Sequence, residues 1–316
     1  MCGIAGFTRF QQPTGDIDTL RNMGNAIIHR GPDAGGEYLD EHVGLCHRRL
    51  AIIDLSSAGN QPMISKCGNY VIVFNGEIYN FKSLRESLIQ EGIEFATETD
   101  TEVLLALYQQ IGTDIVSRIN GMFAFAIWDK SERTLFLARD RLGKKPLYFF
   151  QDNEHFVFGS ELKALQQVSA TPKSLRADAI YDFFTYQYIP DPKTIFEKIY
   201  KLEPGHTLFV DCTGIKKNQY WNVSFSNKTD LSEAEISEQL LSLVDESVKE
   251  RMVSDVPLGA FLSGGVDSSG VVGLMAKNSS SQVTTCSIGF DSKKFDEVSL
   301  RVKSQTNLKQ IIMNLR

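Results

Sequence analysis

The feature that most constrains the fold is a change in the apolar pattern about two thirds of the way along the chain. Up to about residue 212, short runs rich in β-branched and aromatic residues alternate with turn residues, as in RLAIID, YVIVFNGEIY and GMFAFAIWD. After a polar stretch come an amphipathic helix, an apolar strand, a glycine turn, a helix and a second strand, which is the order of a parallel α/β unit. We therefore expect domains at residues 2–212 and 231–316, with a linker at 213–230.

Two helices interrupt the strand-like runs of the first domain. One begins at the N-cap candidate Asn80 and ends at Gly92, and the other runs from Asp100 to Gly112, both with apolar residues at helical spacing. Ser232 is the expected cap of the first helix in the second domain. Several strands with a few helices predict an α+β layered first domain.

The composition narrows the class of protein. The chain of 316 residues is 42% hydrophobic and 23% charged, with a net charge of -6, which is typical of a soluble globular protein and gives no reason to expect a nucleic-acid partner. No stretch approaches the ~18 apolar residues that span a bilayer, and the first twenty residues do not form a signal peptide, so we expect no membrane association and a cytoplasmic location. Five widely spaced cysteines without a CxxC pair argue against disulfides and zinc.

Cys2 directly follows the initiator methionine. If Met1 is removed, Cys2 carries a thiol and an α-amine on one residue, which is a nucleophile with its own base. Reference pKa values of ~7.7–8.0 for the amine and ~8.5 for the thiol allow the amine to accept the thiol proton near neutrality. The alternative is a small apolar residue that opens a buried strand, and the first seven residues alone favour that alternative.

The sequence LSGGVDSS, from Leu262 to Ser269, lies between an apolar strand and a helix. Backbone N–H groups and the positive end of the helix dipole there can bind a phosphate. No GK[ST] follows, so this is not a Walker A loop, and the carboxylate of Asp267 beside a phosphate predicts Mg²⁺. A capped helix start without a ligand is the alternative. The candidate phosphate-binding residues are Ser263, Gly264, Gly265, Asp267, Ser268 and Ser269.

Ordered motifs follow Cys2, namely GIAGF, HRGPD at 29–33, RLAIID at 49–54, NGEIYN at 75–80, TDTEVLL at 99–105, GMFAFAIWD at 121–129 and RDRLGKKPLYF at 139–149. Together they resemble a class II glutamine amidotransferase domain. With SGGVDSS behind them, the chain resembles the glutamine-hydrolysing asparagine synthetases. The resemblance implies an α+β N-terminal-nucleophile hydrolase fold, an αββα sandwich of two antiparallel sheets between helices. A partial α/β ATP-pyrophosphatase domain, similar to the adenine nucleotide α-hydrolases, is then expected behind it.

The resemblance also implies a site for glutamine. Cys2 would attack the carboxamide to give a thioester and ammonia, Asn75 and Gly76 would form the oxyanion hole, and Arg49 and Asp100 would bind the α-carboxylate and the α-ammonium. The residues implied for this site are Cys2, Arg49, Ile52, Asn75, Gly76, Glu77 and Asp100.

Each of these residues also has an ordinary structural explanation. Arg49 fits a surface ion pair, Asp100 a helix N-cap, and Asn75-Gly76 a type I′ hairpin turn. Their joint occurrence behind Cys2 favours the glutamine site. We expect HRGPD to order a loop beside the nucleophile and leave His29 out of catalysis.

For the second domain, the resemblance implies that ATP with Mg²⁺ adenylates the side chain of aspartate and that ammonia then displaces AMP. Leu262 and Ile288 match positions that contact the nucleotide in the family. The expected ligands are glutamine, ATP and aspartate, and a homodimer is left open.

The chain departs from the family at its C-terminal side. Family members are about twice this length and carry an SGExxDE signature that this chain lacks. We expect a truncated chain with only the glutaminase half active, in which the resemblance stops at about residue 297. A different reading frame of the last residues yields a family-like segment, which suggests a frameshift near residues 301–305. An amidotransferase acting on another carboxylate and a folded remnant without turnover are the alternatives.

Overall fold

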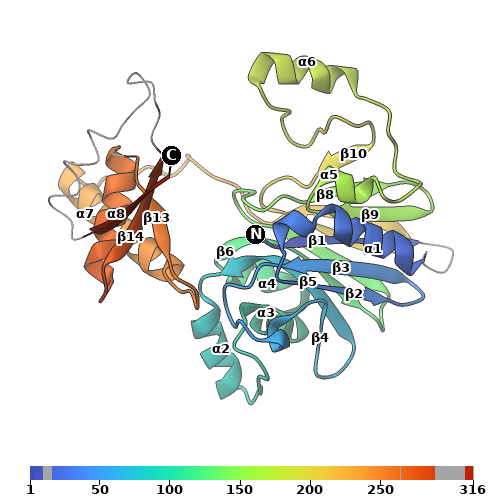
Figure 1. Ribbon diagram of the computed structural model, residues 1–316, viewed down its shortest axis with the longest axis horizontal. Coiled ribbons are helices and arrows are strands. Elements are labelled where there is room, and N and C mark those ends of the chain that lie inside the picture. The colour runs from blue at the N-terminus through green and yellow to red at the C-terminus, as the bar shows by residue number, and fades with distance from the viewer. Residues whose placement is uncertain (10–15, 264, 289–309, 316) are drawn as a thin grey trace. The chain divides into compact units, whose positions relative to one another are not determined.

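The computed structural model describes residues 1–9, 16–263, 265–288 and 310–315. The chain divides into two compact units, Met1–Ser224 and Phe225–Arg316, which are described separately below as unit 1 and unit 2 (Figure 1).

Unit 1 contains two six-stranded sheets. The first has the order β10 (Ile199–Lys201), β8 (Tyr148–Gln151), β9 (His155–Gly159), β1 (Gly3–Arg9), β3 (Val43–Arg49), β2 (Ala34–Leu39). The second has the order β12 (Gly214–Gln219), β11 (His206–Asp211), β7 (Thr134–Arg139), β6 (Gly121–Asp129), β5 (Tyr70–Ile78), β4 (Met63–Ile64). The strand pairs in both sheets are antiparallel.

Alternation along the strands separates the layers. In β5, Val71 and Val73 join the core between the two sheets, and in β1 Ile4 lies in that core while Ala5 and Phe7 point to the other face of the sheet. Because side chains alternate with a period of two, an almost continuously apolar strand can serve two cores at once. The same strands therefore hold the sheets together and bind the outer helices.

Helices cover the outer faces of the sandwich (Figure 1). Helix α1 (Ile17–Ala26) packs on β3 and on α5 (Leu162–Leu165), while α3 (Asp100–Ile111) packs on β5 and contacts α2 (Phe81–Gln90) and α4 (Ile115–Arg118). The short 3-10 helices are η1 (Ile28–Arg30), η2 (Ser57–Gly59) and η3 (Gly112–Asp114), and α6 (Ala177–Tyr186) completes the unit. This layering confirms the predicted αββα sandwich.

The predicted N-cap position is confirmed for α2 and is wrong for α3. Asn80 precedes α2, but its side chain bonds to Arg118 and Asn120 in the neighbouring segment instead of capping the helix. The N-cap of α3 is Thr99, whose hydroxyl accepts the N–H of Glu102 at 3.2 Å. The carboxylate one residue later is therefore not needed as a cap.

Unit 2 begins with α7 (Glu233–Arg251), where Ser232 and Glu235 form a capping box as the predicted Ser232 cap requires. It continues through β13 (Gly259–Phe261), α8 (Val266–Asn278), β14 (Val283–Ile288) and β15 (Gln310–Leu315). The three strands form a parallel sheet in the order β13, β14, β15. The predicted parallel α/β order is confirmed.

The stretch expected as a linker at 213–230 contains a strand. Strand β12 occupies Gly214–Gln219 and pairs with β11, and the division between the units falls after Ser224. The turn into β12 uses Gly214 at a φ of 122°, a conformation that favours glycine. All four residues of the polar run KKNQ are exposed, on both faces of this edge strand, so the run lacks the apolar alternation that marks a strand in a sequence.

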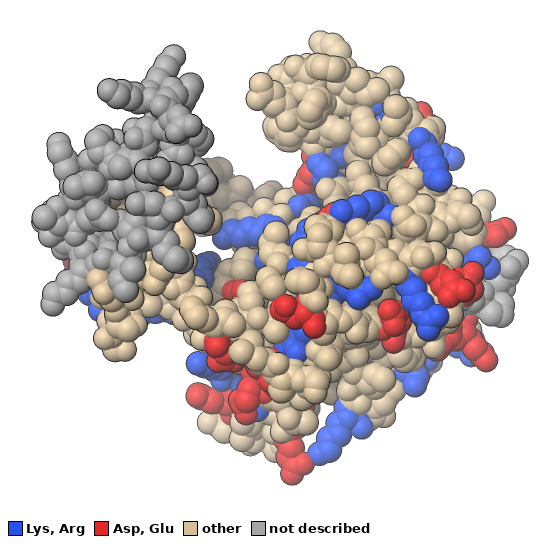
Figure 2. Space-filling model, viewed as in Figure 1, with Lys and Arg blue, Asp and Glu red and all other residues tan. Residues whose placement is uncertain are grey.

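Lys and Arg side chains are interspersed with Asp and Glu side chains on the face of unit 1 seen in Figure 2. Within the described residues, no helix combines the length and the apolar character that a membrane span needs.

Candidate active site

The seven residues predicted for the glutamine site line a single cavity of about 270 Å³ in unit 1. They come from the start of β1, the end of β3, the segment that follows it, the last part of β5 and the first residue of α3. The rest of the lining consists of Met1, Leu50, Ile53, Gln61, Phe74, Thr99, Thr101, Met122 and Lys145. The fold therefore brings together residues that are up to 98 positions apart in the predicted set, from Cys2 to Asp100.

Cys2 lies directly before β1 and contacts two other segments. Its Sγ lies 3.4 Å from the N–H of Leu50, and its carbonyl accepts the Nε–H of Arg30 at 2.9 Å. Arg30 is in turn paired with Glu161 at 3.0 Å. Burial raises the pKa of the Cys2 thiol, and the hydrogen bond with Leu50 opposes that rise. The HRGPD motif thus orders the segment beside Cys2, as expected, through Arg30.

The outer edge of β5 presents backbone N–H groups to the site. The N–H of Phe74 donates to Gln61 Oε1 at 2.6 Å, and the N–H of Ile78 donates to Asp100 Oδ2 at 3.0 Å. Because backbone direction alternates along a strand, the N–H of Gly76, midway between them, points to the same side. That side is the cavity.

The strand register supports this direction for Gly76. Its partner in β6 is Phe123, whose N–H and C=O are both bonded to Asp140 on the opposite side. Gly76 therefore occupies a position without hydrogen bonds to β6. A Cβ there would lie 2.2 Å from the carbonyl oxygen of Met122, so only glycine fits. Asn75-Gly76 is part of a strand, and the hairpin-turn explanation is wrong.

Asn75 is 0% exposed, and within the described residues neither its Nδ2 nor its Oδ1 has a hydrogen-bond partner. An unsatisfied buried polar group costs about 1–3 kcal/mol, so two such atoms facing a cavity indicate a ligand that supplies both a donor and an acceptor. A primary carboxamide supplies both a donor and an acceptor, and an oxyanion that develops on it accepts from Nδ2.

Arg49 is buried and is not part of a surface ion pair, so that explanation is also wrong. Its guanidinium donates to the Ser56 carbonyl at 2.7 Å, to Asn60 Oδ1 at 2.9 Å and to the Asp54 carbonyl. These bonds fix the cation against the loop that follows β3, at the wall of the cavity.

Two carboxyl groups lie in the same cavity. Burial raises the pKa of Asp100 to about 7, with the charge of Glu77 adding to the rise and the N–H of Ile78 opposing it. Burial also raises the pKa of Glu77, and the ammonium of Lys145 opposes that shift. A pocket with two desolvated carboxyl groups attracts a cationic group, such as the α-ammonium of an amino acid.

Sequence reasoning did not identify Gln61 or Lys145 as site residues. Gln61 joins β5 to α3, because its Oε1 accepts from Phe74 and its Nε2 donates to Thr101 Oγ1 at 3.1 Å. Lys145 stands in the quoted motif RLGKKPLYF, which was the available signal. No comparable motif surrounds Gln61.

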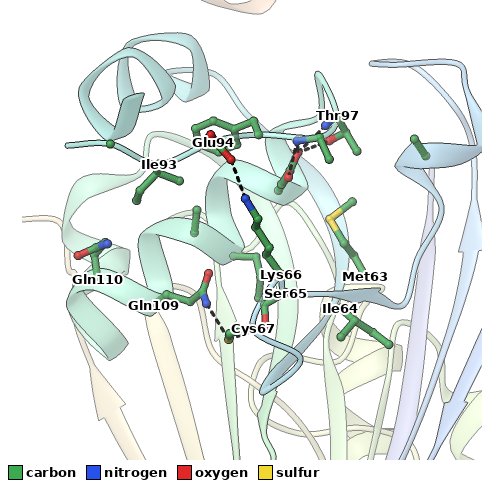
Figure 3. Close-up of a pocket in the computed structure, with 17 residues that line it drawn as sticks. Met63, Ile64, Ser65, Lys66, Cys67, Ile93, Glu94, Thr97, Gln109 and Gln110 are labelled. Carbon is green, nitrogen blue, oxygen red and sulfur yellow. Dashed lines mark hydrogen bonds and ion pairs between the residues drawn. The ribbon is translucent and has the colours of Figure 1, made fainter. Parts of the chain in front are cut away.

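A larger cavity of about 690 Å³ lies elsewhere in unit 1, between the β4–β5 turn and α3 (Figure 3). Lys66 and Glu94 form an ion pair at 2.7 Å beside it, and Gln109 donates to Cys67 Sγ at 3.1 Å. None of the predicted site residues lines this cavity. The seven predicted residues, with Cys2 and the two carboxyl groups among them, line the smaller cavity.

The predicted phosphate loop connects β13 to α8 in unit 2. Leu262 is buried and its N–H donates to the Cys286 carbonyl at 2.9 Å. The hydroxyls of Ser263 and Ser268 lie 3.1 Å apart, and α8 begins after Gly265 without a side-chain cap. Uncapped N–H groups and hydroxyls at a helix start suit a phosphate.

Fewer contacts are described for the other residues predicted to bind the nucleotide. Asp267 lies exposed in the first turn of α8, and Ser269 bonds to the Gly265 carbonyl through its N–H. Gly264 lies outside the described residues, and for Ile288 only its backbone place at the end of β14 is described. In the described part of the chain, no group of three or more His, Cys, Asp or Glu side chains could hold a metal ion.

Comparison with known proteins agrees with this geometry. Residues 1–221 match the family model described as a glutamine amidotransferase domain, and residues 239–309 match the model described as asparagine synthase. The second match extends beyond residue 297, so the expected end of the resemblance was wrong.

Similar proteins include asparagine synthetase [glutamine-hydrolyzing] 1 of Bacillus subtilis, 39% identical over 302 residues that cover 94% of this chain and 47% of that protein. A putative asparagine synthetase [glutamine-hydrolyzing] 2 of Methanocaldococcus jannaschii is 40% identical over 320 residues, covering 94% of this chain and 61% of the relative. The chain thus spans about half the length of these relatives.

Among solved structures, the glutamine phosphoribosylpyrophosphate amidotransferase of B. subtilis, complexed with ADP and GMP, matches with a TM-score of 0.52 and 17% identity. The match covers 98% of this chain and 65% of that one. At this identity the likeness concerns the fold alone.

Proposed function

The chain belongs to the glutamine amidotransferase family, and from that premise we propose that unit 1 hydrolyses glutamine to glutamate and ammonia with Cys2 as the nucleophile. The observation that carries the proposal is the cavity that holds Cys2 beside Asn75, whose two buried amide atoms lack partners within the described residues. Among the cysteines of the described part of unit 1, Cys2 is the one that lines this cavity.

The chemistry requires removal of Met1, which frees the α-amine of Cys2. The amine accepts the thiol proton, and the thiolate attacks the carboxamide carbon of glutamine. The N–H of Gly76 and the Nδ2 of Asn75 then donate to the oxyanion. Collapse of the tetrahedral intermediate transfers the proton to the leaving nitrogen and releases ammonia. Water attacks the resulting thioester and gives glutamate with free Cys2.

Charge complementarity fixes the substrate in one orientation. We assign the α-ammonium of glutamine to Asp100 and Glu77, and the α-carboxylate to Arg49. Ile52, which lines the cavity between the charged groups, contacts the aliphatic part of the side chain. This arrangement leaves the carboxamide to face Cys2.

The test is release of glutamate from glutamine by the wild-type chain and by Cys2→Ala, together with the intact mass of the purified protein. We expect loss of the residue mass of Met1 and loss of activity in Cys2→Ala. Cys67→Ala is the matched control, because Cys67 is a thiol of unit 1 outside this cavity, and it should retain full activity. Equal activity in Cys2→Ala would contradict the proposal, and absence of turnover in every variant would favour a remnant.

For unit 2 we propose binding of ATP at residues 262–269. Support comes from the loop between β13 and α8, with its hydroxyls and uncapped helix start, and from the match to the asparagine synthase model. Asp267 would reach the phosphates through Mg²⁺, which commonly keeps several waters and binds one or two carboxylates.

The complete reaction that we propose is glutamine-dependent synthesis of asparagine, in which ATP activates aspartate as an acyl adenylate and ammonia displaces AMP. The alternative is that ammonia is transferred to a carboxylate other than that of aspartate. We also propose a cytoplasmic location and a homodimer. Incubation of the chain with glutamine, ATP, Mg²⁺ and either aspartate or glutamate tests the acceptor. Asparagine and AMP in equal amounts support the proposal; glutamate release without AMP restricts the function to unit 1.

A further inference from the structure

Lys145 lies in the wall of the same cavity as Cys2 and is only 5% exposed. No carboxylate among the described residues forms an ion pair with its ammonium, although the charge of Glu77 is near enough to act on it. Burying an ammonium without a paired carboxylate is costly. A position with that cost, in a cavity that holds the nucleophile, suggests a role in the chemistry.

The loop that carries Lys145 is rigidly held. The carboxylate of Asp140, itself buried, accepts the N–H groups of Leu142, Lys144 and Lys145 at 3.1, 2.9 and 2.9 Å. Arg139 Nε donates to the carbonyl of Lys145 at 2.9 Å. These bonds fix the backbone of Lys145, and its side chain forms part of the cavity wall.

The electrostatics couple Lys145 to Cys2. Burial raises the pKa of the Cys2 thiol, while the α-ammonium of Met1 and the ammonium of Lys145 oppose that rise and Asp100 adds to it. Burial lowers the pKa of Lys145 itself, opposed by Glu77 and Cys2. Burial also lowers the pKa of the α-amine of Met1, which lies directly before Cys2, an effect that Lys145 reinforces.

The other charged groups around this pair act in both directions. Arg30 lowers the pKa of the Met1 α-amine and of Lys145, whereas Asp33 raises the pKa of the Met1 α-amine and Asp140 raises that of Lys145. Removal of Met1 gives Cys2 its own α-amine, and in that thiol–amine pair loss of the first proton takes the net charge from +1 to 0. A fixed positive charge nearby favours that loss whichever of the two groups gives up the proton.

We propose that Lys145 supplies the fixed positive charge that prepares Cys2, by favouring the form of its thiol–amine pair that has lost one proton. The inference rests on the proposed glutaminase function, and it makes Lys145 a residue that acts through the nucleophile. Lys145 would also stabilise the negative charge that develops when the thiolate attacks the carboxamide.

The experiment measures the rate of alkylation of Cys2 by iodoacetamide as a function of pH, with peptide mass mapping to separate Cys2 from the other cysteines. No glutamine is needed, so the measurement is independent of turnover. Lys145→Met keeps the length and apolar stem and removes the charge, and Lys145→Arg keeps the charge. Lys144→Met is the matched control, since Lys144 is the neighbouring lysine and is exposed.

In Lys145→Met we expect the midpoint of the alkylation profile to move to higher pH by about one unit, with alkylation at pH 7 about tenfold slower. Lys145→Arg should stay close to wild type, and Lys144→Met should match it. The acid limb of the kcat/KM profile for glutamine should move by the same amount. Thermal unfolding of each variant identifies any loss caused by misfolding.

An unchanged midpoint in a folded Lys145→Met overturns the inference, even if its kcat falls. A rise in KM with an unchanged alkylation profile would also overturn it, because Lys145 would then bind substrate. If wild-type Cys2 is alkylated with the expected pH dependence but glutamine is not turned over, the proposed function fails and the inference about Lys145 stands.

Discussion

Unit 1 and unit 2 bury their apolar side chains to very different degrees. In unit 1 two large clusters of buried apolar side chains support the sheets, and Phe123, Phe125 and Phe136 are almost completely buried in contact with one another. In the described part of unit 2, the fully or nearly buried apolar side chains are Val248, Leu262, Val272, Met275 and Val283. Leu240, Leu241, Leu243, Phe261 and Val266 are exposed there.

This difference shows which of the two proposed sites has side chains held in a fixed environment. A buried large apolar side chain contributes roughly 1.5–3 kcal/mol, so the layered core of unit 1 can hold Asn75, Asp100 and Lys145 in place despite the cost of burying them. In unit 2 the described residues give the backbone order and the loop at 262–265, but few side chains with a fixed environment. The proposed glutamine site is therefore supported by the positions of buried side chains, and the proposed nucleotide site by the order of backbone elements.

The same substitution in the two units should give the largest contrast. Phe125→Ala removes a side chain that is 0% exposed and should destabilise unit 1 by about 3–5 kcal/mol. Phe261→Ala removes one that is 74% exposed and should change the stability of unit 2 by less than about 0.5 kcal/mol. Urea unfolding monitored by tryptophan fluorescence reports unit 1 alone, because the 2 tryptophans, Trp128 and Trp221, both lie there.

Far-ultraviolet circular dichroism on the same samples reports the helices of both units. If Phe261→Ala lowered stability as much as Phe125→Ala, the contrast between the two units would be wrong. That result would mean that Phe261 is covered in solution.

Asn75→Ala tests the proposed oxyanion site with no expected loss of stability in unit 1. Removing one oxyanion donor should lower kcat roughly 10²–10³-fold. Stability should not fall, because the two amide atoms have no partners among the described residues to lose. Glutamate release and the fluorescence-detected unfolding midpoint check the two statements. Ser263→Ala in unit 2 is the control and should leave glutamate release unchanged; a comparable loss there would show that the units are coupled in catalysis.

The raised pKa of the Asp100 carboxyl group predicts that glutamine binding depends on pH. Its pKa of about 7 means that the carboxylate needed by the α-ammonium becomes protonated as the pH falls through neutrality. Below pH 7 the Kd for glutamine should therefore rise about tenfold per pH unit. Titration calorimetry on Cys2→Ala isolates binding from turnover. Asp100→Asn should bind glutamine weakly at every pH between 5 and 8, and a wild-type-like slope in that variant would assign the dependence to another group.

Much of this organisation could be predicted from the sequence, because it depends on local patterns. The runs of β-branched and aromatic residues correctly identified β5 and β6, but the run RLAIID is not a strand, because β3 ends at Arg49. The predicted order of unit 2 is confirmed, and the ordered motifs named seven residues that line one cavity. The capping box at Ser232 was visible because Glu235 stands three residues later.

What the sequence could not predict depends on contacts between distant segments. Thr99 rather than Asp100 caps α3 because the carboxylate of Asp100 is bonded to Ile78 in β5. Lys145 is buried through bonds of its backbone to Asp140 and Arg139, which no spacing in RLGKKPLYF reveals. Strand β12 is recognised only through its pairing with β11, since its own residues are polar.

Ser232→Ala should give the smallest effect and the sharpest test of whether the two units unfold independently. Loss of the cap of α7 should destabilise unit 2 by about 1 kcal/mol, because the N–H of Glu235 loses its acceptor. Ser237→Ala is the matched control, an exposed serine inside α7, and should stabilise the helix by a few tenths of a kcal/mol through higher helix propensity. Circular dichroism should resolve the opposite signs, while the tryptophan transition of unit 1 stays at the wild-type midpoint in both variants. If Ser232→Ala also lowered the midpoint of the tryptophan transition, α7 would stabilise unit 1, and the two units would not unfold independently.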